Sequence, residues 1–189
     1  MSETRALLIV DVQNDFTEGG ALGCDGGAAV AAALADHVRA SDYAIVVASR
    51  DWHNAGDDNG GHFGPEPDFV TTWPVHCVAG TEGAKYHPDF DASVIDVHVK
   101  KGQGEPAYSA FEGTTDDGGL LAEVLKNAGV TAVDVVGIAT DYCVRASALD
   151  ALGEGMRVRV LTKLTASVNE QTAADALAEL ASAGVEIVR

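Results

Sequence analysis

Three polar residues that follow apolar segments could together form a nucleophilic centre. They are Asp11, Lys101 and Cys143. A thiol beside a carboxylate and an ammonium group supplies a nucleophile, a base and a positive charge that stabilises the thiolate. Each residue also has an ordinary structural explanation when taken alone. A lone cysteine is most often a small buried hydrophobe, and an aspartate at the end of a strand most often caps a turn.

The position of Cys143 favours reactivity over simple burial. It lies near the start of a predicted helix, residues 141–152, which follows an apolar strand. A helix N-terminus presents free N–H groups and a partial positive charge, and both favour the thiolate. Cys24 lies in a glycine-rich loop and Cys77 in a long irregular connection, without such an element beside them. We therefore expect Cys143 to be the nucleophile.

A second set of residues fits a metal site. Asp51 and His53 are two residues apart in extended chain, so their side chains point the same way. His62 and His76 lie on the long connection that follows. One aspartate and two or three histidines suit a single divalent ion such as Zn, Fe or Mn. Each histidine alone would more often be structural, and Cys77 is a conceivable extra ligand, although adjacent residues rarely bind one ion together.

Two adjacent lysines, Lys100 and Lys101, must point to opposite sides of an extended strand. Only one of them can face a site at the end of that strand. We expect it to be Lys101, because Gly102 follows it directly and marks the turn.

Three aromatic residues, Phe16, Trp73 and Tyr108, lie in loops near these polar residues. Flat rings in that place could hold a planar substrate between them. The alternative is that they only fill the loops.

These residues can meet only if the chain folds as alternating strands and helices. Buried-type apolar runs occupy 6–12, 44–48, 94–99, 133–138, 158–161 and 185–188, and helical periodicity occupies 28–40, 120–128, 141–152 and a segment around 173–180. Strands that alternate with helices predict an α/β fold with a mostly parallel sheet, here as one domain over residues 1–189. Ligands of such sheets bind beyond the carboxyl ends of the strands.

Composition excludes several other classes of protein. The chain has 189 residues, which suits one domain, and a formal net charge of -17, which argues against nucleic acid as a partner. The start, Met1–Arg5, lacks signal-peptide features, and no apolar run approaches the roughly 20 residues of a membrane span. Three widely spaced cysteines fit a reduced, cytoplasmic setting. The acidic surface is either simply well solvated or adapted to high salt.

The motifs, read together, resemble the nicotinamidase branch of the isochorismatase-like cysteine hydrolases. The matching stretches run in order along almost the whole chain: ALLIVDVQNDF (6–16), EGGAL (18–22), SRDWH (49–53), GHF (61–63), TTWPVHCVAGTEGAKYHP (71–88), KG (101–102), AYSAFEG (107–113) and DVVGIATDYCVRASALDAL (134–152). The resemblance implies a single three-layer domain with a mostly parallel six-stranded sheet flanked by helices.

The resemblance also implies roles for individual residues. The implied catalytic triad is Asp11, Lys101 and Cys143, and the implied metal ligands are Asp51, His53 and His76, with His62 as a ligand in only some members. The implied ring-binding wall is Phe16, Trp73, Tyr108 and Ile138. The bond between Ile138 and Ala139 corresponds to a cis peptide in the family. The N–H groups of Ala139 and Cys143 would then bind an oxyanion.

The implied activity is hydrolysis of nicotinamide to nicotinic acid and ammonia, through a thioester on Cys143 and with one divalent metal ion. It would serve NAD salvage and extend to pyrazinamide. The expected partner is this small substrate, without nucleic acid or membrane, and the oligomeric state is left open, a homo-oligomer included. Two alternatives remain: another hydrolase of this fold, such as an isochorismatase or a carbamoyl-amide hydrolase, or a non-catalytic protein that binds a metal or ligand.

Overall fold

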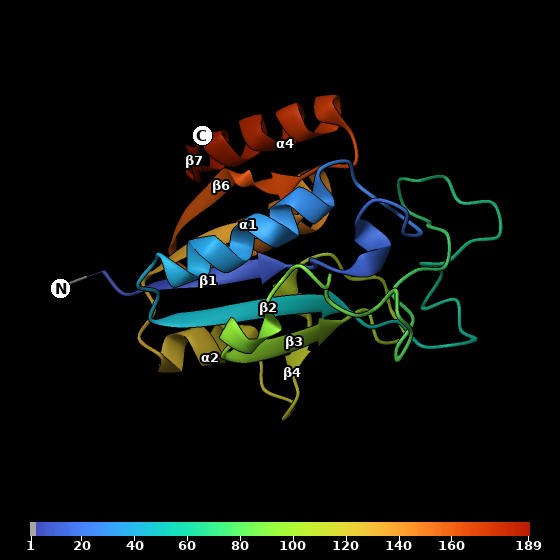
Figure 1. Cartoon of the computed structure of the whole chain (residues 1–189), viewed down its shortest axis with the longest axis horizontal. Coiled ribbons are helices and arrows are strands. Elements are labelled where there is room, and N and C mark those ends of the chain that lie inside the picture. Colours follow the sequence, from blue (N-terminus) through green and yellow to red (C-terminus); the bar gives the residue numbers. More distant parts are fainter. Residues whose placement is uncertain (1–2) are drawn as a thin grey trace.

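A seven-stranded sheet runs through the centre of the protein in the order β4-β3-β2-β1-β5-β6-β7 (Figure 1). The strands are β1 (Arg5–Val10), β2 (Ile45–Asp51), β3 (Val97–Lys101), β4 (Thr114–Thr115), β5 (Ala132–Ile138), β6 (Arg157–Ala166) and β7 (Glu186–Val188). All neighbours pair in parallel except β3 and β4. This computed structural model describes residues 3–189, so Met1 and Ser2 of the polar N-terminus lie outside it. The prediction of a mostly parallel α/β sheet is confirmed.

The expected number of six strands is wrong by one. The additional strand is β4, in which Thr114 and Thr115 pair antiparallel with Lys100 and Val99 at the edge of the sheet. Two residues are too few to show a period in the sequence. Only the neighbouring strand reveals them as part of the sheet.

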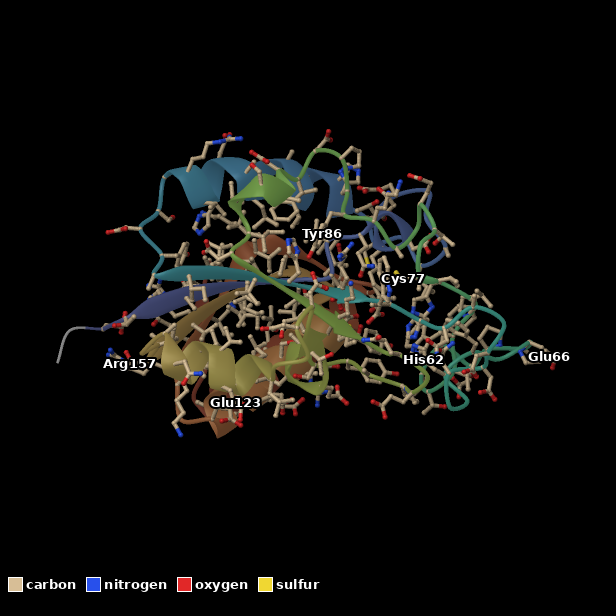
Figure 2. The ribbon with its side chains drawn as sticks, turned by 90° about the horizontal axis from the view of Figure 1, so that it is seen from below. His62, Glu66, Cys77, Tyr86, Glu123 and Arg157 are labelled. Carbon is tan, nitrogen blue, oxygen red and sulfur yellow. The ribbon has the colours of Figure 1, made fainter. Side chains whose placement is uncertain are left out.

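Helices cover both faces of the sheet and make three layers. They are α1 (Gly27–Arg39), α2 (Leu121–Asn127), α3 (Arg145–Gly153) and α4 (Glu170–Ala183). Leu7 and Ile9 of β1 pack with α1 on one face, whereas Leu8 packs with α2, α3 and α4 on the other. Figure 2 shows α1 and α2 on opposite sides of the sheet. Strands buried on both faces explain why their sequences read as unbroken apolar runs.

The third strand was expected at residues 94–99, and its predicted start is wrong. Ala92–Val94 forms a 3₁₀ turn instead, which begins where the Asp91 carboxylate accepts the N–H of Ser93. The strand β3 starts at Val97 and ends at Lys101, whose register partner in β2 is Asp51. The shift places a lysine and an aspartate side by side at the carboxyl edge of the sheet.

The helix predicted at 141–152 also begins differently. Thr140–Val144 forms a π-helix, in which the Val144 N–H donates to the Ala139 carbonyl at 3.0 Å, and α3 follows it. The peptide bond between Ile138 and Ala139 is cis. An apolar pattern alone does not separate a π-helical turn from an α-helical one, because both expose similar faces over so few residues.

The carboxyl ends of β1, β2, β3 and β5 lie at one edge of the sheet, and the loops gather beyond it. The long connection between β2 and β3 extends past this edge, at the right of Figure 1. Two isolated bridges, His53 with Val78 and Phe63 with Trp73, tie this connection to itself. None of the helices within residues 3–189 is long and apolar enough to cross a membrane.

Candidate active site

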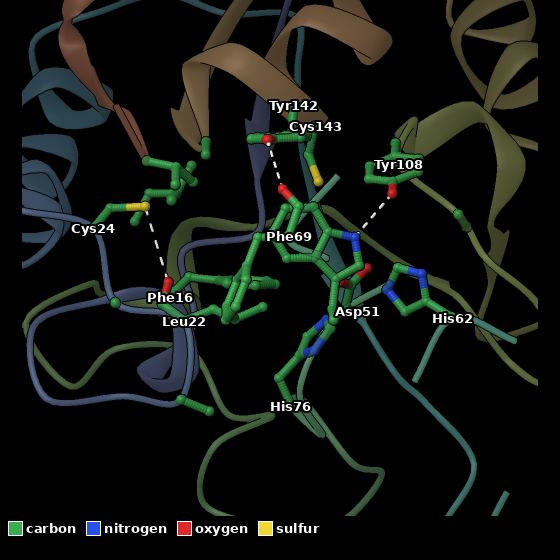
Figure 3. Close-up of a pocket in the computed structure, with 17 residues that line it drawn as sticks. Phe16, Leu22, Cys24, Asp51, His62, Phe69, His76, Tyr108, Tyr142 and Cys143 are labelled. Carbon is green, nitrogen blue, oxygen red and sulfur yellow. Dashed lines mark hydrogen bonds and ion pairs between the residues drawn. The ribbon is translucent and has the colours of Figure 1, made fainter. Parts of the chain in front are cut away.

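A cavity of about 260 Å³ opens at the carboxyl edge of the sheet. Figure 3 shows its two chemically distinct ends: the Cys143 thiol at one, and His62 and His76 with Asp51 at the other. The rest of the lining is aromatic and aliphatic. A ligand in this cavity can therefore touch the thiol and the histidines at once.

The ammonium group of Lys101 joins the polar residues behind the thiol. Its Nζ lies 2.9 Å from Asp11 Oδ2 and 3.6 Å from Cys143 Sγ, and it also donates to the Asp51 carboxylate. The side chain of Lys101 is completely buried. Lys100 points away and pairs with Asp116 at 2.8 Å. The alternation along β3 thus directs one lysine into the site and the other to the surface.

Asp11 has one occupied and one available oxygen. Its Oδ1 accepts a hydrogen bond from the Ser49 hydroxyl at 2.7 Å, whereas its Oδ2 faces Lys101 without a well-aligned hydrogen bond. Complete burial raises the pKa of the Asp11 carboxyl, although the nearby Lys101 ammonium opposes the rise. A buried carboxylate with one free oxygen and a raised pKa is suited to accept a proton.

The pKa of Cys143 contradicts the expectation drawn from its place at a helix start. Burial raises the pKa of the thiol well above its usual value, and the carboxylates of Asp11 and Asp51 act in the same direction. Only Lys101 lowers it. Burial therefore opposes ionisation of the thiol, and a base is needed to remove its proton.

Three histidines and an aspartate converge at the other end of the cavity. Ring nitrogens of His53, His62 and His76 lie within 4.8 Å of one another. Asp51 Oδ2 is 3.6 Å from Nε2 of both His53 and His76. Burial lowers the pKa of His62 to about 4, which keeps its imidazole neutral and able to bind a metal.

Backbone carbonyls hold two of these imidazoles with a free nitrogen toward the cluster. Nδ1 of His53 is 2.7 Å from the Gly102 carbonyl, and Nδ1 of His76 is 2.7 Å from the Pro74 carbonyl. Such a contact assigns the proton to Nδ1 and leaves the lone pair on Nε2. Nε2 of His53 and Nδ1 of His62 are buried without a hydrogen-bond partner among residues 3–189. Orphaned nitrogens beside a carboxylate fit one divalent ion of the zinc type.

The close approach of the His53 ring to the main chain at position 102 requires a glycine there. A Cβ at this position would lie 2.5 Å from Cε1 of His53, and the residue has a φ of +75°. Cys77 does not join the cluster: its buried Sγ lies 4.0 Å from the Gly83 carbonyl.

Aromatic side chains from separate loops form one wall of the cavity. The Trp73 Nε1–H donates to the Tyr108 hydroxyl at 3.0 Å, and the ring of Tyr142 meets Trp73 edge-on at 5.1 Å. Phe16 also lines the cavity, and the centroid of its ring lies 5.5 Å from that of His76. The arrangement favours a flat, partly apolar ligand.

The sequence as a whole matches a known family. Residues 5–189 match the model described as the isochorismatase domain. The chain belongs to the isochorismatase family. Within that family it is 51% identical to the nicotinamidase/pyrazinamidase of Mycobacterium tuberculosis, an alignment that covers 97% of this chain and 98% of that protein.

Two solved structures share the isochorismatase-family fold and much of the sequence. The pyrazinamidase of Pyrococcus horikoshii, solved in complex with zinc, superposes with a TM-score of 0.81 at 34% identity, covering 98% of this chain and 99% of that one. PnC1 of L. infantum, solved in complex with nicotinate, gives a TM-score of 0.85 at 34% identity, covering 100% and 94%.

The structure places Asp11 and Lys101 beside Cys143, and Asp51 with His53, His62 and His76. It leaves Cys77 and Lys100 outside these groups and adds other residues to the site. The Ser49 hydroxyl donates to Asp11, and Gln13 accepts the main-chain N–H of Asp51. Tyr142 and Phe69 line the cavity. Tyr142 could have been found from its place beside the nucleophile. Ser49 and Gln13 carry no signal by themselves, because their roles depend on partners 38 residues away.

Replacing one imidazole tests the metal site. His53→Ala should weaken zinc binding by more than about 10²-fold, because changes to residues that only orient metal ligands already cost 10–100-fold. Chelator competition measures the dissociation constant, and circular dichroism checks the fold. His98→Ala is the matched control, since His98 contacts Tyr86 outside the cluster. Equal zinc affinity in the two variants would contradict the assignment.

Proposed function

We propose that the protein hydrolyses nicotinamide to nicotinic acid and ammonia, with Cys143 as the nucleophile and one bound divalent metal ion. The observation that carries the proposal is a single cavity lined by both the Cys143 thiol and the histidine cluster. A pyridine amide matches it, because its ring nitrogen and its amide carbonyl are separate polar groups on one flat ring, and each can reach a different end of the cavity. The names of the relatives support an amidohydrolase of this kind.

The first step is removal of the thiol proton. Asp11 Oδ2, the carboxylate oxygen left free by Ser49, takes the proton from Cys143 Sγ. Lys101 lies 3.6 Å from the sulfur and stabilises the thiolate that forms. Burial raises the pKa of the Asp11 carboxyl, which makes it a stronger base toward the neighbouring thiol.

The thiolate then attacks the amide carbonyl and forms a C–S bond. The developing oxyanion rests on the N–H groups of Ala139 and Cys143. Asp11 returns its proton to the leaving nitrogen as the C–N bond breaks, and ammonia departs. Water attacks the remaining thioester, releases nicotinic acid and restores the thiol, so the Asp11, Lys101 and Cys143 set ends as it began.

The other end of the cavity binds and orients the ring. Asp51, His53 and His76 would hold the metal ion, with His62 as a further ligand. When bound, the ion supplies an open coordination position for the pyridine nitrogen and so orients the substrate. Phe16, Trp73, Tyr108 and Ile138 enclose the ring. Pyrazinamide has the same ring nitrogen and amide and should also be hydrolysed, and the main reaction would serve NAD salvage.

The substrate assignment is tested by ammonia release from nicotinamide and from benzamide, which lacks the ring nitrogen. Nicotinamide should be hydrolysed far faster, and a chelator should remove that advantage without unfolding the protein. The ring-orienting role is wrong if benzamide proves an equally good substrate of the metal-loaded protein.

The nucleophile is tested with the two thiols that line the cavity. Cys143→Ala should lower turnover of nicotinamide by more than about 10³-fold, as expected when a covalent catalyst loses its nucleophile. Cys24→Ala should stay within a few-fold of wild type, because Lys101 lies beside the Cys143 thiol, whereas the Cys24 thiol donates to the Leu22 carbonyl at 4.0 Å. Substantial turnover by Cys143→Ala would overturn the mechanism.

The adjacent lysines provide a matched pair. Lys101→Ala should lower turnover at saturating nicotinamide by about 10²-fold or more, by analogy with the loss of one group that stabilises developing charge. Lys100→Ala removes a surface ion pair with Asp116 and a cation–π contact with Trp52, and should leave turnover near wild type. Circular dichroism must show that both variants fold. The reverse order of activities would be incompatible with the proposed role of Lys101.

A further inference from the structure

The backbone pairing between β1 and β2 stops before the site. The parallel register runs from Ala6 with Ile45 to Ile9 with Ala48. Asp11 then turns the chain away with a φ of 49°, while β2 continues to Asp51. The N–H and C=O of Asp51 face the β1 side, since the next N–H, that of Trp52, donates to the Lys101 carbonyl of β3.

The side chain of Gln13 takes the place of the missing strand neighbour. The Asp51 N–H donates to Gln13 Oε1 at 2.8 Å, and Gln13 Nε2 donates back to the Asp51 carbonyl at 2.9 Å. In a parallel sheet the N–H and C=O of one residue are bound by two different peptide groups of the neighbouring strand, whereas here one side-chain amide binds both. The second hydrogen of Nε2 goes to the Ala84 carbonyl at 3.0 Å. Gln13 is completely buried, and its amide has partners on both sides.

We propose that Gln13 is a positioning residue for the metal ion, an inference that rests on the metal site of the proposed function. Its amide fixes the main chain of Asp51, and thereby holds the Asp51 carboxylate 3.6 Å from Nε2 of His53 and of His76. The bond to Ala84 ties the same amide to the connection that carries His76. One side chain thus holds two of the ligand-bearing segments in register.

A second side-chain hydrogen bond links the same two strand ends, this time from β2 to the end of β1. It connects the proposed metal site to the proposed catalytic base. Ser49 of β2 donates its hydroxyl to Asp11 of the β1 end, two residues before Gln13. The base and the metal ligand are therefore linked through reciprocal contacts between the same two strand ends. The distance between Asp11 and Asp51 sets where a ring and its amide must lie. It follows from these side-chain hydrogen bonds and not from backbone pairing between β1 and β2.

The neighbouring residue offers a matched control. The Asn14 side-chain Nδ2 donates to the Glu82 carbonyl at 2.8 Å, in the same connection that Gln13 reaches through Ala84. It is also an amide that binds a carbonyl of that loop, but it has no bond to a metal-ligand residue. Loss of the Asn14 contact therefore reports the purely structural contribution of such a tie.

The experiment measures the zinc dissociation constant of full-length wild type, Gln13→Met and Asn14→Ala by chelator competition, together with melting temperatures of the metal-free proteins. Gln13→Met should raise the dissociation constant by about 10–100-fold, the usual effect of losing a group that orients a ligand. Asn14→Ala should lower the melting temperature at most and leave the dissociation constant unchanged. Gln13→Asn, one carbon too short for both bonds, replaces Gln13→Met if the latter does not fold.

The outcomes distinguish failure of the Gln13 inference from failure of the proposed metal site. If the wild type takes up no zinc, the metal site and the role of Gln13 are both overturned. If the wild type binds zinc and a folded Gln13 variant binds it equally well, only the positioning role is overturned, even if the variant melts earlier. Weaker zinc binding in the Gln13 variant, with Asn14→Ala unchanged, supports the inference.

Discussion

The ammonium group of Lys101 is buried between the carboxylates of Asp11 and Asp51, and the rest of the site depends on this arrangement. Burial alone would lower the pKa of Lys101, but the two carboxylates hold it well above its usual value. Charges removed from water need such partners, because an unpaired buried charge is strongly destabilising. Among these three groups, one negative charge remains uncompensated. A cation beside Asp51 would compensate it, which agrees with the unpaired imidazole nitrogens that surround this carboxylate.

Lys101 also contacts both of two polar groups with different chemistry, one at Cys143 and one at Asp51. Toward Asp11 and Cys143, burial raises the pKa of both the carboxyl and the thiol. Toward Asp51 the groups are imidazoles and a carboxylate whose pKa is held well below its usual value, despite burial, by Lys101 and the histidines. Binding of a ring and attack on its amide can therefore be assigned to different residues, although one lysine contacts both carboxylates.

The parallel sheet brings these ends together because it collects the carboxyl ends of β1, β2, β3 and β5 at one edge. The backbone ladder alone does not complete the site. Beyond Ile9 and Ala48, side chains continue the contacts between β1 and β2: Ser49 binds Asp11, and Gln13 binds the main chain of Asp51. Buried polar side chains with their hydrogen bonds made are suited to this purpose, because any displacement would leave buried groups unpaired.

The sequence by itself determined the α/β class, the alternation of strands and helices along the chain, and the polar residues at the strand ends. Strands buried on both faces leave unbroken apolar runs, so positions such as Asp11 and Lys101 stand out where the runs end. The alternation of side chains along a strand showed that only one of Lys100 and Lys101 could face the site, and Gly102 after Lys101 indicated which one. Tertiary structure alone decided the extra strand β4, the start of β3 and the π-helical turn before α3. It also decided the raised pKa of Cys143 and the partners of Ser49 and Gln13. These features arise from desolvation and from contacts between segments far apart in the chain, which local patterns of residue type do not record.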